Sequence, residues 1–224
     1  MSKHVLVAAL LALTAAPMAH AAQEWTLGRN YFAVEPVQHT NVPAGKVEVT
    51  EVFSYACPAC NQFNPYIQQL RRTLPANAVL DFLPAAFNPA EDWVVFERAF
   101  FTAQVLGLVD RTHDAIYDAV WKSGELSVSD PTTHKLRSPL PAIEDVAKAY
   151  NRLTGVPVEK FVATANSFTV AVKMKSADAL VLAYHVDRTP TLIVNGKYRL
   201  NVESAGGAEQ LIQLVNYLVA KETH

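Results

Sequence analysis

The stretch VEVTEVFSYACPAC, residues 47–60, decides the fold, because a β-branched and aromatic run leads directly into a pair of cysteines. Val49 and Phe53 share one parity with Glu51, which is the alternation of a β-strand. Pro58 then stands where the first residue of a helix is expected, a position at which its missing N–H is harmless. The stretch therefore predicts a strand, a tight turn and a helix that begins at the cysteine pair.

Cys57 and Cys60 are the only cysteines of the chain. The loop that they would close is too short to restrict the unfolded chain much, so a structural staple explains them poorly. Structural zinc normally takes four protein ligands, and the sequence has neither a second cysteine pair nor a His-x₃-His spacing. Two thiols at the start of a helix that follows a strand are typical of a redox pair. We predict a redox-active pair without metal or cofactor, with a staple or a metal site as the alternatives.

The N-terminus has the pattern of a secretory signal peptide. A short positive start precedes an apolar run over residues 5–16, and the triplet AHA at 19–21 has small residues at its first and third positions. The run is too short for a membrane span, and it lacks the polar face of a buried amphipathic helix. We expect residues 1–21 to be removed and the mature chain to reach an oxidising compartment, where a disulfide persists.

Composition limits the classes of function. Half of the 224 residues are hydrophobic, and the formal net charge is −2, which does not suggest a nucleic-acid-binding surface. Only eight glycines occur, and no phosphate-binding loop is among them. The length fits one large domain, or one domain that carries an inserted subdomain.

Apolar spacing predicts the elements that follow the cysteines. A helix is expected from Pro58 onward, with Pro65 inside it as a kink, and a strand is expected over residues 78–83. Helical stripes then run through residues 93–103, 116–120, 143–153 and 157–165. Residues 122–141 are rich in Ser, Thr and Pro, and we predict a long loop there.

The C-terminal third returns to the sheet. Helical spacing of apolar residues over 170–184 predicts a longer helix. Asn195-Gly196 lies between two apolar runs and is a strong hairpin signal. Gly206-Gly207 breaks the chain before a closing amphipathic helix over 211–218. A strand–helix–strand unit and a hairpin–helix unit, separated by helices, predict an α/β fold with one mixed sheet and a helical insertion.

That order resembles the thioredoxin superfamily and, more narrowly, the DsbA family of bacterial periplasmic disulfide oxidoreductases. The resemblance is carried by EVFSYACPAC at 51–60, by the interrupting helical block, and by TPTLIVNGKY at 189–198. It implies a thioredoxin-like mixed sheet with an inserted all-helical subdomain. We expect the first part of that domain at 22–87, the helical insertion at 88–165, and a connecting helix with the second part at 166–224.

The resemblance also implies site residues. It gives Pro190 a cis peptide bond that faces the cysteines, where an ordinary strand-entry proline is the alternative. Together with Pro58 and Ala59, Thr189 and Pro190 are then the substrate-binding residues, with the backbone of Thr189 pairing with an extended peptide. Ala59 replaces the histidine of the archetypal enzymes, which predicts weaker oxidising power. A threonine before the proline is more typical of the isomerase branch.

Cys57 is expected to be the exposed, acidic sulfur, since unpaired N–H groups and the positive end of the helix dipole stabilise its thiolate. Cys60 lies one turn further in, where burial raises the pKa of a thiol. Glu51 shares strand parity with apolar residues, so we predict that it points into the core and acts as the base for Cys60. The alternative is an edge-strand acid that faces solvent. The family's lysine near this acid has no counterpart in residues 78–83.

We therefore predict a periplasmic thiol:disulfide oxidoreductase that donates the Cys57–Cys60 disulfide to newly exported proteins through a mixed disulfide on Cys57. By resemblance, its partners are reduced exported proteins and a membrane quinone-linked reoxidant of the DsbB type. The near-zero net charge predicts no nucleic-acid partner, and a monomer is the default expectation. One alternative is a disulfide isomerase or reductase, although too few residues precede Val47 for the usual N-terminal dimerisation domain. The other is a non-catalytic periplasmic peptide-binding module with a structural disulfide.

Overall fold

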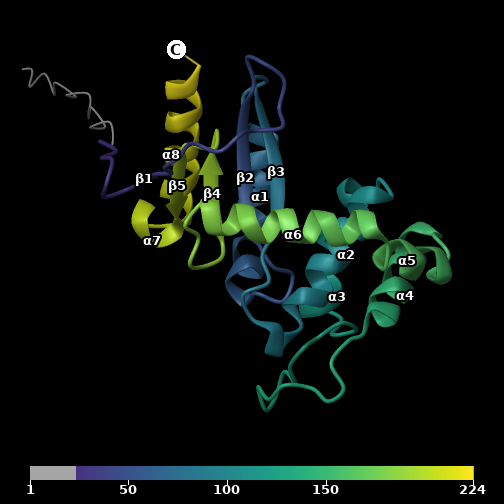
Figure 1. The fold of residues 1–224 in the computed structure, drawn as a ribbon. Coiled ribbons are helices and arrows are strands. Elements are labelled where there is room, and N and C mark those ends of the chain that lie inside the picture. The colour runs from purple at the N-terminus through teal and green to yellow at the C-terminus, as the bar shows by residue number, and fades with distance from the viewer. Residues whose placement is uncertain (1–23, 224) are drawn as a thin grey trace, which may run out of the picture.

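The fold is a five-stranded mixed sheet flanked by helices (Figure 1). The computed structural model describes residues 24–223, and the predicted signal peptide at 1–21 lies outside this range. The strand order is β1-β5-β4-β2-β3. The strands are β1 (Phe32–Ala33), β2 (Val47–Phe53), β3 (Ala78–Pro84), β4 (Thr191–Val194) and β5 (Tyr198–Asn201). Strand β2 pairs in parallel with β3 and antiparallel with β4, so the sheet is mixed as predicted.

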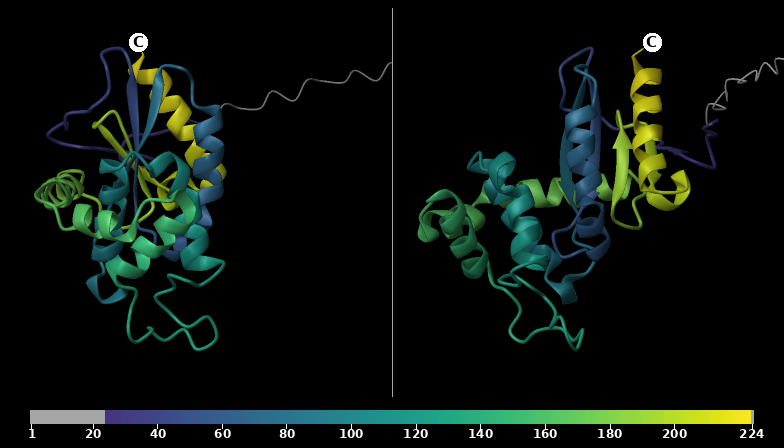
Figure 2. Two further views of the ribbon diagram at one scale, coloured as in Figure 1. Left: turned by 90° about the vertical axis from the view of Figure 1, so that its right-hand side faces the viewer. Right: turned by 180° about the vertical axis from the view of Figure 1, so that it is seen from behind.

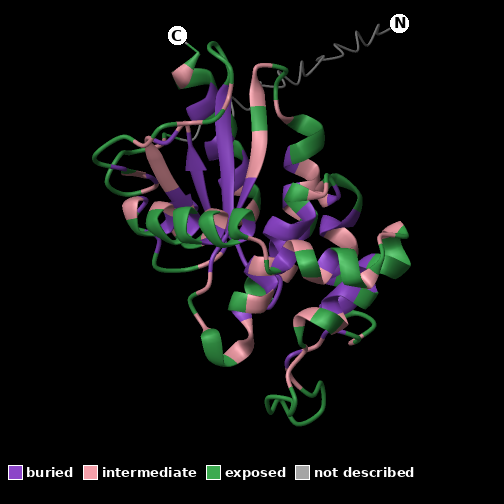
Figure 3. Ribbon diagram, turned by 45° about the vertical axis from the view of Figure 1, so that its right-hand side comes forward, coloured by how far each residue is buried: buried purple, intermediate pink, exposed green. Residues whose placement is uncertain are grey.

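The central strand β2 is buried along its whole length, because helices cover both faces of the sheet. Helices α1 (Pro58–Thr73) and α8 (Ala208–Glu222) lie on one face, and α6 (Phe168–Ala183) crosses the other (Figures 1 and 2). The inner side of α6 is buried against the sheet and its outer side is exposed (Figure 3). Burial on both faces explains why every side chain of β2, Glu51 included, lies in the interior.

The inserted helices stand between β3 and α6. They are the 3₁₀ turn η1 (Pro89–Glu91) and the helices α2 (Trp93–Val105), α3 (Val109–Trp121), α4 (Ile143–Thr154) and α5 (Val158–Ala165). Their apolar stripes join the core of the sheet, and Phe96, Phe100 and Tyr150 are at most 1% exposed in it. Residues 122–141 form a loop without helix, as predicted. The fold class is thereby confirmed, while the domain boundaries at 87 and 165 remain a prediction.

The hairpin between β4 and β5 turns where the sequence predicts, through Asn195 and Gly196 at φ 54° and 65°. Gly196 is required here, because a Cβ at this position would lie 2.2 Å from the carbonyl oxygen of Gln38. The sequence pattern did not predict three short elements, namely β1, η1 and α7 (Val202–Ala205). Among residues 24–223, no helix has both the length and the apolar character needed to cross a bilayer.

Candidate active site

Cys57 is the N-cap of α1, and Pro58 occupies the first helical position. The sulfur of Cys57 accepts a hydrogen bond from the backbone N–H of Cys60, at 3.3 Å. Both cysteines are free thiols. The expectation of an exposed sulfur is wrong in degree, because Cys57 is only 5% exposed and Cys60 is fully buried. The difference arises because another loop covers the start of α1.

That loop contains Thr189 and Pro190, which are joined by a cis peptide bond, as the resemblance implied. The hydroxyl of Thr189 donates to the sulfur of Cys57 at 3.2 Å. The thiol of Cys57 in turn donates a hydrogen bond to the backbone carbonyl oxygen of Thr189, at 3.6 Å. Thr189 was predicted to bind substrate through its backbone, and its side-chain contact with the sulfur was not predicted. A hydroxyl residue directly before the predicted cis proline is the signal that could have revealed it.

The two thiols have opposite acidities. A hydrogen bond from the Cys60 side chain lowers the pKa of Cys57 to about 6, opposed by burial and assisted by the hydroxyl of Thr189 and by backbone N–H groups of α1. Burial raises the pKa of Cys60 well above its ordinary value, and the neighbouring Cys57 raises it further. One sulfur is therefore ionised at neutral pH and the other stays protonated, which is the asymmetry that thiol exchange needs.

Glu51 lies beneath this pair in the core. It is 1% exposed, which excludes the alternative of an edge-strand acid facing solvent. Burial raises the pKa of the Glu51 carboxyl well above its usual range, as does the negative charge of Cys57, while the guanidinium of Arg71 opposes them. Arg71 comes from the last turn of α1, and the sequence analysis did not foresee a cation near Glu51. Neither carboxyl oxygen has a hydrogen-bond partner among the described residues.

Helix α3 packs polar side chains against the same region. Asn64, one turn after Cys60 on α1, donates from its amide to a carboxylate oxygen of Asp114 at 3.2 Å. The buried hydroxyl of Tyr117 has no hydrogen-bond partner among residues 24–223. Burial is the main cause that raises the pKa of Tyr117, and the charges of Cys60 and Glu51 raise it further. The indole of Trp121, at the end of α3, donates to the carbonyl oxygen of Tyr55 at 2.8 Å. The inserted helices therefore help to hold the loop that carries Cys57.

A groove of about 550 Å³ runs beside Ala59 and Pro190. Phe63 and Tyr66, whose rings stack with their centroids 5.7 Å apart, contribute apolar wall on α1. An exposed ion pair between Arg188 and Glu203 borders it. The groove therefore offers an apolar wall with charges at its edge.

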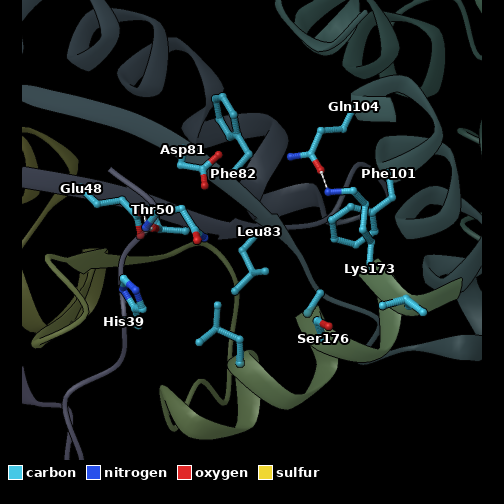
Figure 4. A pocket seen from close by; sticks show the side chains of 14 residues that line it. His39, Glu48, Thr50, Asp81, Phe82, Leu83, Phe101, Gln104, Lys173 and Ser176 are labelled. Carbon is cyan, nitrogen blue, oxygen red and sulfur yellow. Dashed lines mark hydrogen bonds between the residues drawn. The ribbon is translucent and has the colours of Figure 1, made fainter. Parts of the chain in front are cut away.

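A second cavity, of about 290 Å³, lies between the sheet, α2 and α6. Figure 4 shows the side chains of Glu48, Thr50 and Asp81 at one corner of this cavity and Lys173 with Gln104 at another. Neither cysteine lines it, and neither do Thr189 or Pro190. Its chemistry is therefore separate from that of the thiols.

The sequence of this chain is similar to those of known proteins with a thioredoxin-like fold. A family model described as thioredoxin matches residues 41–214. The thiol:disulfide interchange protein DsbA of Pseudomonas aeruginosa is 34% identical over 221 residues, which cover 98% of this chain and 97% of that protein. The protein of the same name from Azotobacter vinelandii is 34% identical and covers 88% of this chain, with 84% of its own length matched.

Solved structures agree. The crystal structure of Pseudomonas aeruginosa DsbA has a TM-score of 0.74 at 36% identity, covering 88% of this chain and 94% of that one. The structure of the oxidoreductase DsbA from Xylella fastidiosa has a TM-score of 0.76 at 29% identity, covering 88% and 97%. Both the sequence and the fold are thus similar over nearly the full length of these relatives.

Proposed function

The chain belongs to the DsbA family of thiol:disulfide interchange proteins, and from that premise we propose that it donates a Cys57–Cys60 disulfide to newly exported proteins. It is a thiol:disulfide oxidoreductase, and the proposal concerns the direction and the clients of the reaction. The observation that carries the proposal is the Cys57 sulfur at the N-cap of α1, where the N–H of Cys60 and the hydroxyl of Thr189 donate to it and help to lower its pKa to about 6. A stabilised thiolate favours the dithiol form, so the disulfide form is an oxidant.

The reaction has two exchanges. A client thiolate attacks the sulfur of Cys57, the Cys57–Cys60 bond breaks, and Cys60 leaves with the electron pair. A second client thiolate then attacks the client sulfur of the mixed disulfide and releases the Cys57 thiolate. The client loses two electrons and two thiol protons, while the enzyme gains two electrons and one proton on Cys60, so that one proton goes to solvent.

In this proposal, Glu51 handles the proton of Cys60. The departing Cys60 thiolate has a raised pKa and takes a proton from the protonated carboxyl of Glu51. Reoxidation reverses the transfer. The expected result of Glu51→Gln is slower exchange at neutral pH in stopped-flow fluorescence, and an unchanged rate would refute this role.

The groove beside Ala59 and Pro190 is the proposed client-binding surface, where Pro58, Ala59 and Thr189 surround the reactive sulfur. An extended client peptide would place its cysteine there and its apolar side chains along Phe63 and Tyr66. We also propose a periplasmic location, a monomeric enzyme, and reoxidation by a membrane quinone-linked partner of the DsbB type.

Reduction or isomerisation is the second candidate function, since Ala59 supplies no side-chain donor to the thiolate. The two directions are separated by the reduction potential measured against glutathione, because an isomerase or reductase must be mostly reduced in its compartment. A potential as low as that of a reductant would overturn the oxidase proposal.

The direct experiment is single-turnover oxidation of a dithiol peptide by the oxidised protein, followed by mass spectrometry of the peptide. Wild type should yield the oxidised peptide, and Cys57→Ser should yield none. Cys60→Ser provides the matched control, because its Cys57 thiolate should still attack a disulfide-bonded peptide and retain one peptide sulfur as a mixed disulfide. Equal peptide oxidation by wild type and Cys57→Ser would refute the mechanism.

A further inference from the structure

The buried thiol and the buried acid both need a route for protons. Cys60 is fully buried and Glu51 is 1% exposed, so neither exchanges a proton directly with bulk water. Yet each turnover of the proposed oxidase moves a proton to Cys60 and returns it later. Glu51 can store one proton, but once it has given that proton to Cys60 it is a buried carboxylate with a raised pKa, which favours uptake of another proton from outside while Cys60 stays reduced.

Several polar atoms near Cys60 lack hydrogen-bond partners among the described residues. They are both carboxyl oxygens of Glu51, the hydroxyl of Tyr117 and the amide oxygen of Asn64. Buried polar atoms that the protein leaves unpaired are normally satisfied by bound water or used in chemistry. Asn64 follows Cys60 by four residues on α1, so the two side chains share one face of the helix. The unpaired atoms therefore gather on the side of α1 that faces the core.

One contact leads outward from this cluster. The amide of Asn64 donates to the carboxylate of Asp114 at 3.2 Å, and Asp114 is partly exposed at the junction of α1 and α3. The negative charge of Asp114 also raises the pKa of Glu51, so the two carboxyl groups are close enough to interact. Asp114 is therefore a partly exposed acid whose charge reaches Glu51, and the amide of Asn64 holds its carboxylate at this junction.

We propose that Asp114, oriented by Asn64, passes protons between solvent and Glu51 and so acts as a positioning residue for the reduction and reoxidation of the cysteine pair. This inference rests on the proposed function. When Cys60 leaves as a thiolate, Glu51 gives it a proton, Asp114 reprotonates Glu51 through bound water, and Asp114 takes a proton from solvent. Reoxidation returns the proton along the same residues.

The charged groups around Glu51 agree with this assignment. Cys57 and Arg71 come from the two ends of α1, and Asp114 comes from α3. Arg71 stays protonated throughout the physiological range and cannot carry the proton. On the flanking strands, the residues in register with Glu51 are Phe82 and Leu192, which carry no titratable group. Among these charged neighbours, Asp114 is the one carboxylate that also reaches solvent.

The test is the multiple-turnover rate at which wild type, Asp114→Asn and Glu51→Gln oxidise a dithiol peptide, with oxidised glutathione as the reoxidant, measured against pH and buffer concentration. Asp114→Asn keeps an acceptor for Asn64 but cannot carry a proton, so we expect about a tenfold slower exchange at neutral pH, within the range of acid–base effects. Added imidazole should restore the rate, since a small buffer can replace the lost proton carrier. The double variant should be no slower than Glu51→Gln alone, because both residues serve one route.

Controls separate the possible outcomes. Asp118→Asn changes an exposed acid one turn further along α3, which pairs with Lys122, and should leave the rate and its buffer dependence unchanged. Asp114→Glu should recover most of the rate. A slow Asp114→Asn variant that buffer does not rescue, or one with a wild-type pH profile, would overturn the inference. Failure of wild type itself to oxidise the peptide would instead refute the proposed function.

Discussion

At the scale of single residues, the acidity of Cys57 depends on contacts from two parts of the chain. The N–H of Cys60 comes from its own helix, while the hydroxyl of Thr189 comes from a loop 132 residues away. Ala59 provides no side-chain donor, and Thr189 supplies one from the opposite side of the sulfur. The prediction of weaker oxidising power rests on Ala59 alone and does not include the hydroxyl of Thr189.

Replacing Thr189 with valine tests this contact. The variant keeps the shape of the side chain but loses the hydroxyl donor, and a hydrogen bond to a charged group contributes about 1.5 kcal/mol. We expect the pKa of Cys57 to rise by about one unit from its value near 6. Ultraviolet absorbance of the thiolate during a pH titration measures this directly. Thr189→Ser retains the hydroxyl and should keep the low pKa, whereas an equal rise in both variants would contradict the assignment.

Residue patterns in the sequence predicted some of this site and not the rest. The parity of Glu51 with Val49 and Phe53 predicted an inward carboxyl, because alternation along a strand is a local property. The burial of Cys57 depends on tertiary contact with Thr189, which no local pattern contains. The nearness of Asp114 to Glu51 likewise depends on how α3 packs against α1. Local chemistry was predictable from the sequence, and the pairing of distant side chains was not.

At the scale of elements, a buried acid lies between α2 and α6. Glu97 is 2% exposed, and burial together with the charge of Asp178 raises its pKa to about 8, opposed by Arg98. Its carboxyl is more easily ionised in the unfolded chain, so stability is greatest below its ordinary pKa of 4.5 and is lost as the pH rises toward 8.

Glu97→Gln should remove this pH dependence. We expect the variant to match wild type in acid and to exceed its free energy of unfolding by about 2 kcal/mol in mild alkali. Urea denaturation of the reduced proteins across the pH range measures the difference. Glu144→Gln, which alters an exposed glutamate in α4, should follow wild type. A gap between Glu97→Gln and wild type that stayed constant with pH would show that the side chain acts through packing alone.

The β4–β5 hairpin offers a second test at this scale. Gly196 and Gly155 both have left-handed backbone, at φ 65° and 77°, but only Gly196 has backbone of another segment against it. Gly155→Ala should cost about 1 kcal/mol of stability from conformation alone. Gly196→Ala must also displace Gln38, and we expect a loss of about 3 kcal/mol. Equal losses in thermal denaturation would mean that the contact with Gln38 does not constrain the turn.

The helices and the main strands were predictable because each is long enough for its apolar residues to repeat several times. The repeat follows the helical period in the helices and the two-residue period in the strands. The two-residue strand β1 and the four-residue helix α7 carry no such period. Strand β1 exists because it pairs with β5, and that pairing is a property of the folded sheet.

At the scale of the whole molecule, thiolate formation links redox state to folding. The ordinary pKa of a cysteine, 9.0, falls to about 6 at Cys57, and only the reduced form has this thiolate. A depressed pKa stabilises the folded state above the ordinary pKa, and this stabilisation is lost as the pH falls through about 6. The reduced form should therefore gain stability over the oxidised form as the pH rises between these values.

The expected gain is about 1.4 kcal/mol for each pH unit in that window. Paired urea denaturation curves of the two forms, in mild acid and in mild alkali, give the difference in the free energy of unfolding. Reduced Cys57→Ser cannot form the thiolate at this position and should lose the extra pH dependence. If the free energy of unfolding of reduced wild type fell relative to that of oxidised wild type as the pH rose, the proposed source of oxidising power would be wrong.

The distance in sequence between Cys57 and Thr189 has a consequence for the chain during its own synthesis. A nascent polypeptide that stops short of residue 189 already contains both thiols and the segment that becomes α1, but it lacks the hydroxyl that completes the sulfur's surroundings. Its Cys57 then lacks one of the hydrogen bonds that lower the pKa of this thiol in the finished protein. The surroundings of the catalytic sulfur are thus complete only after the segment that carries Thr189 has been made and has docked beside α1.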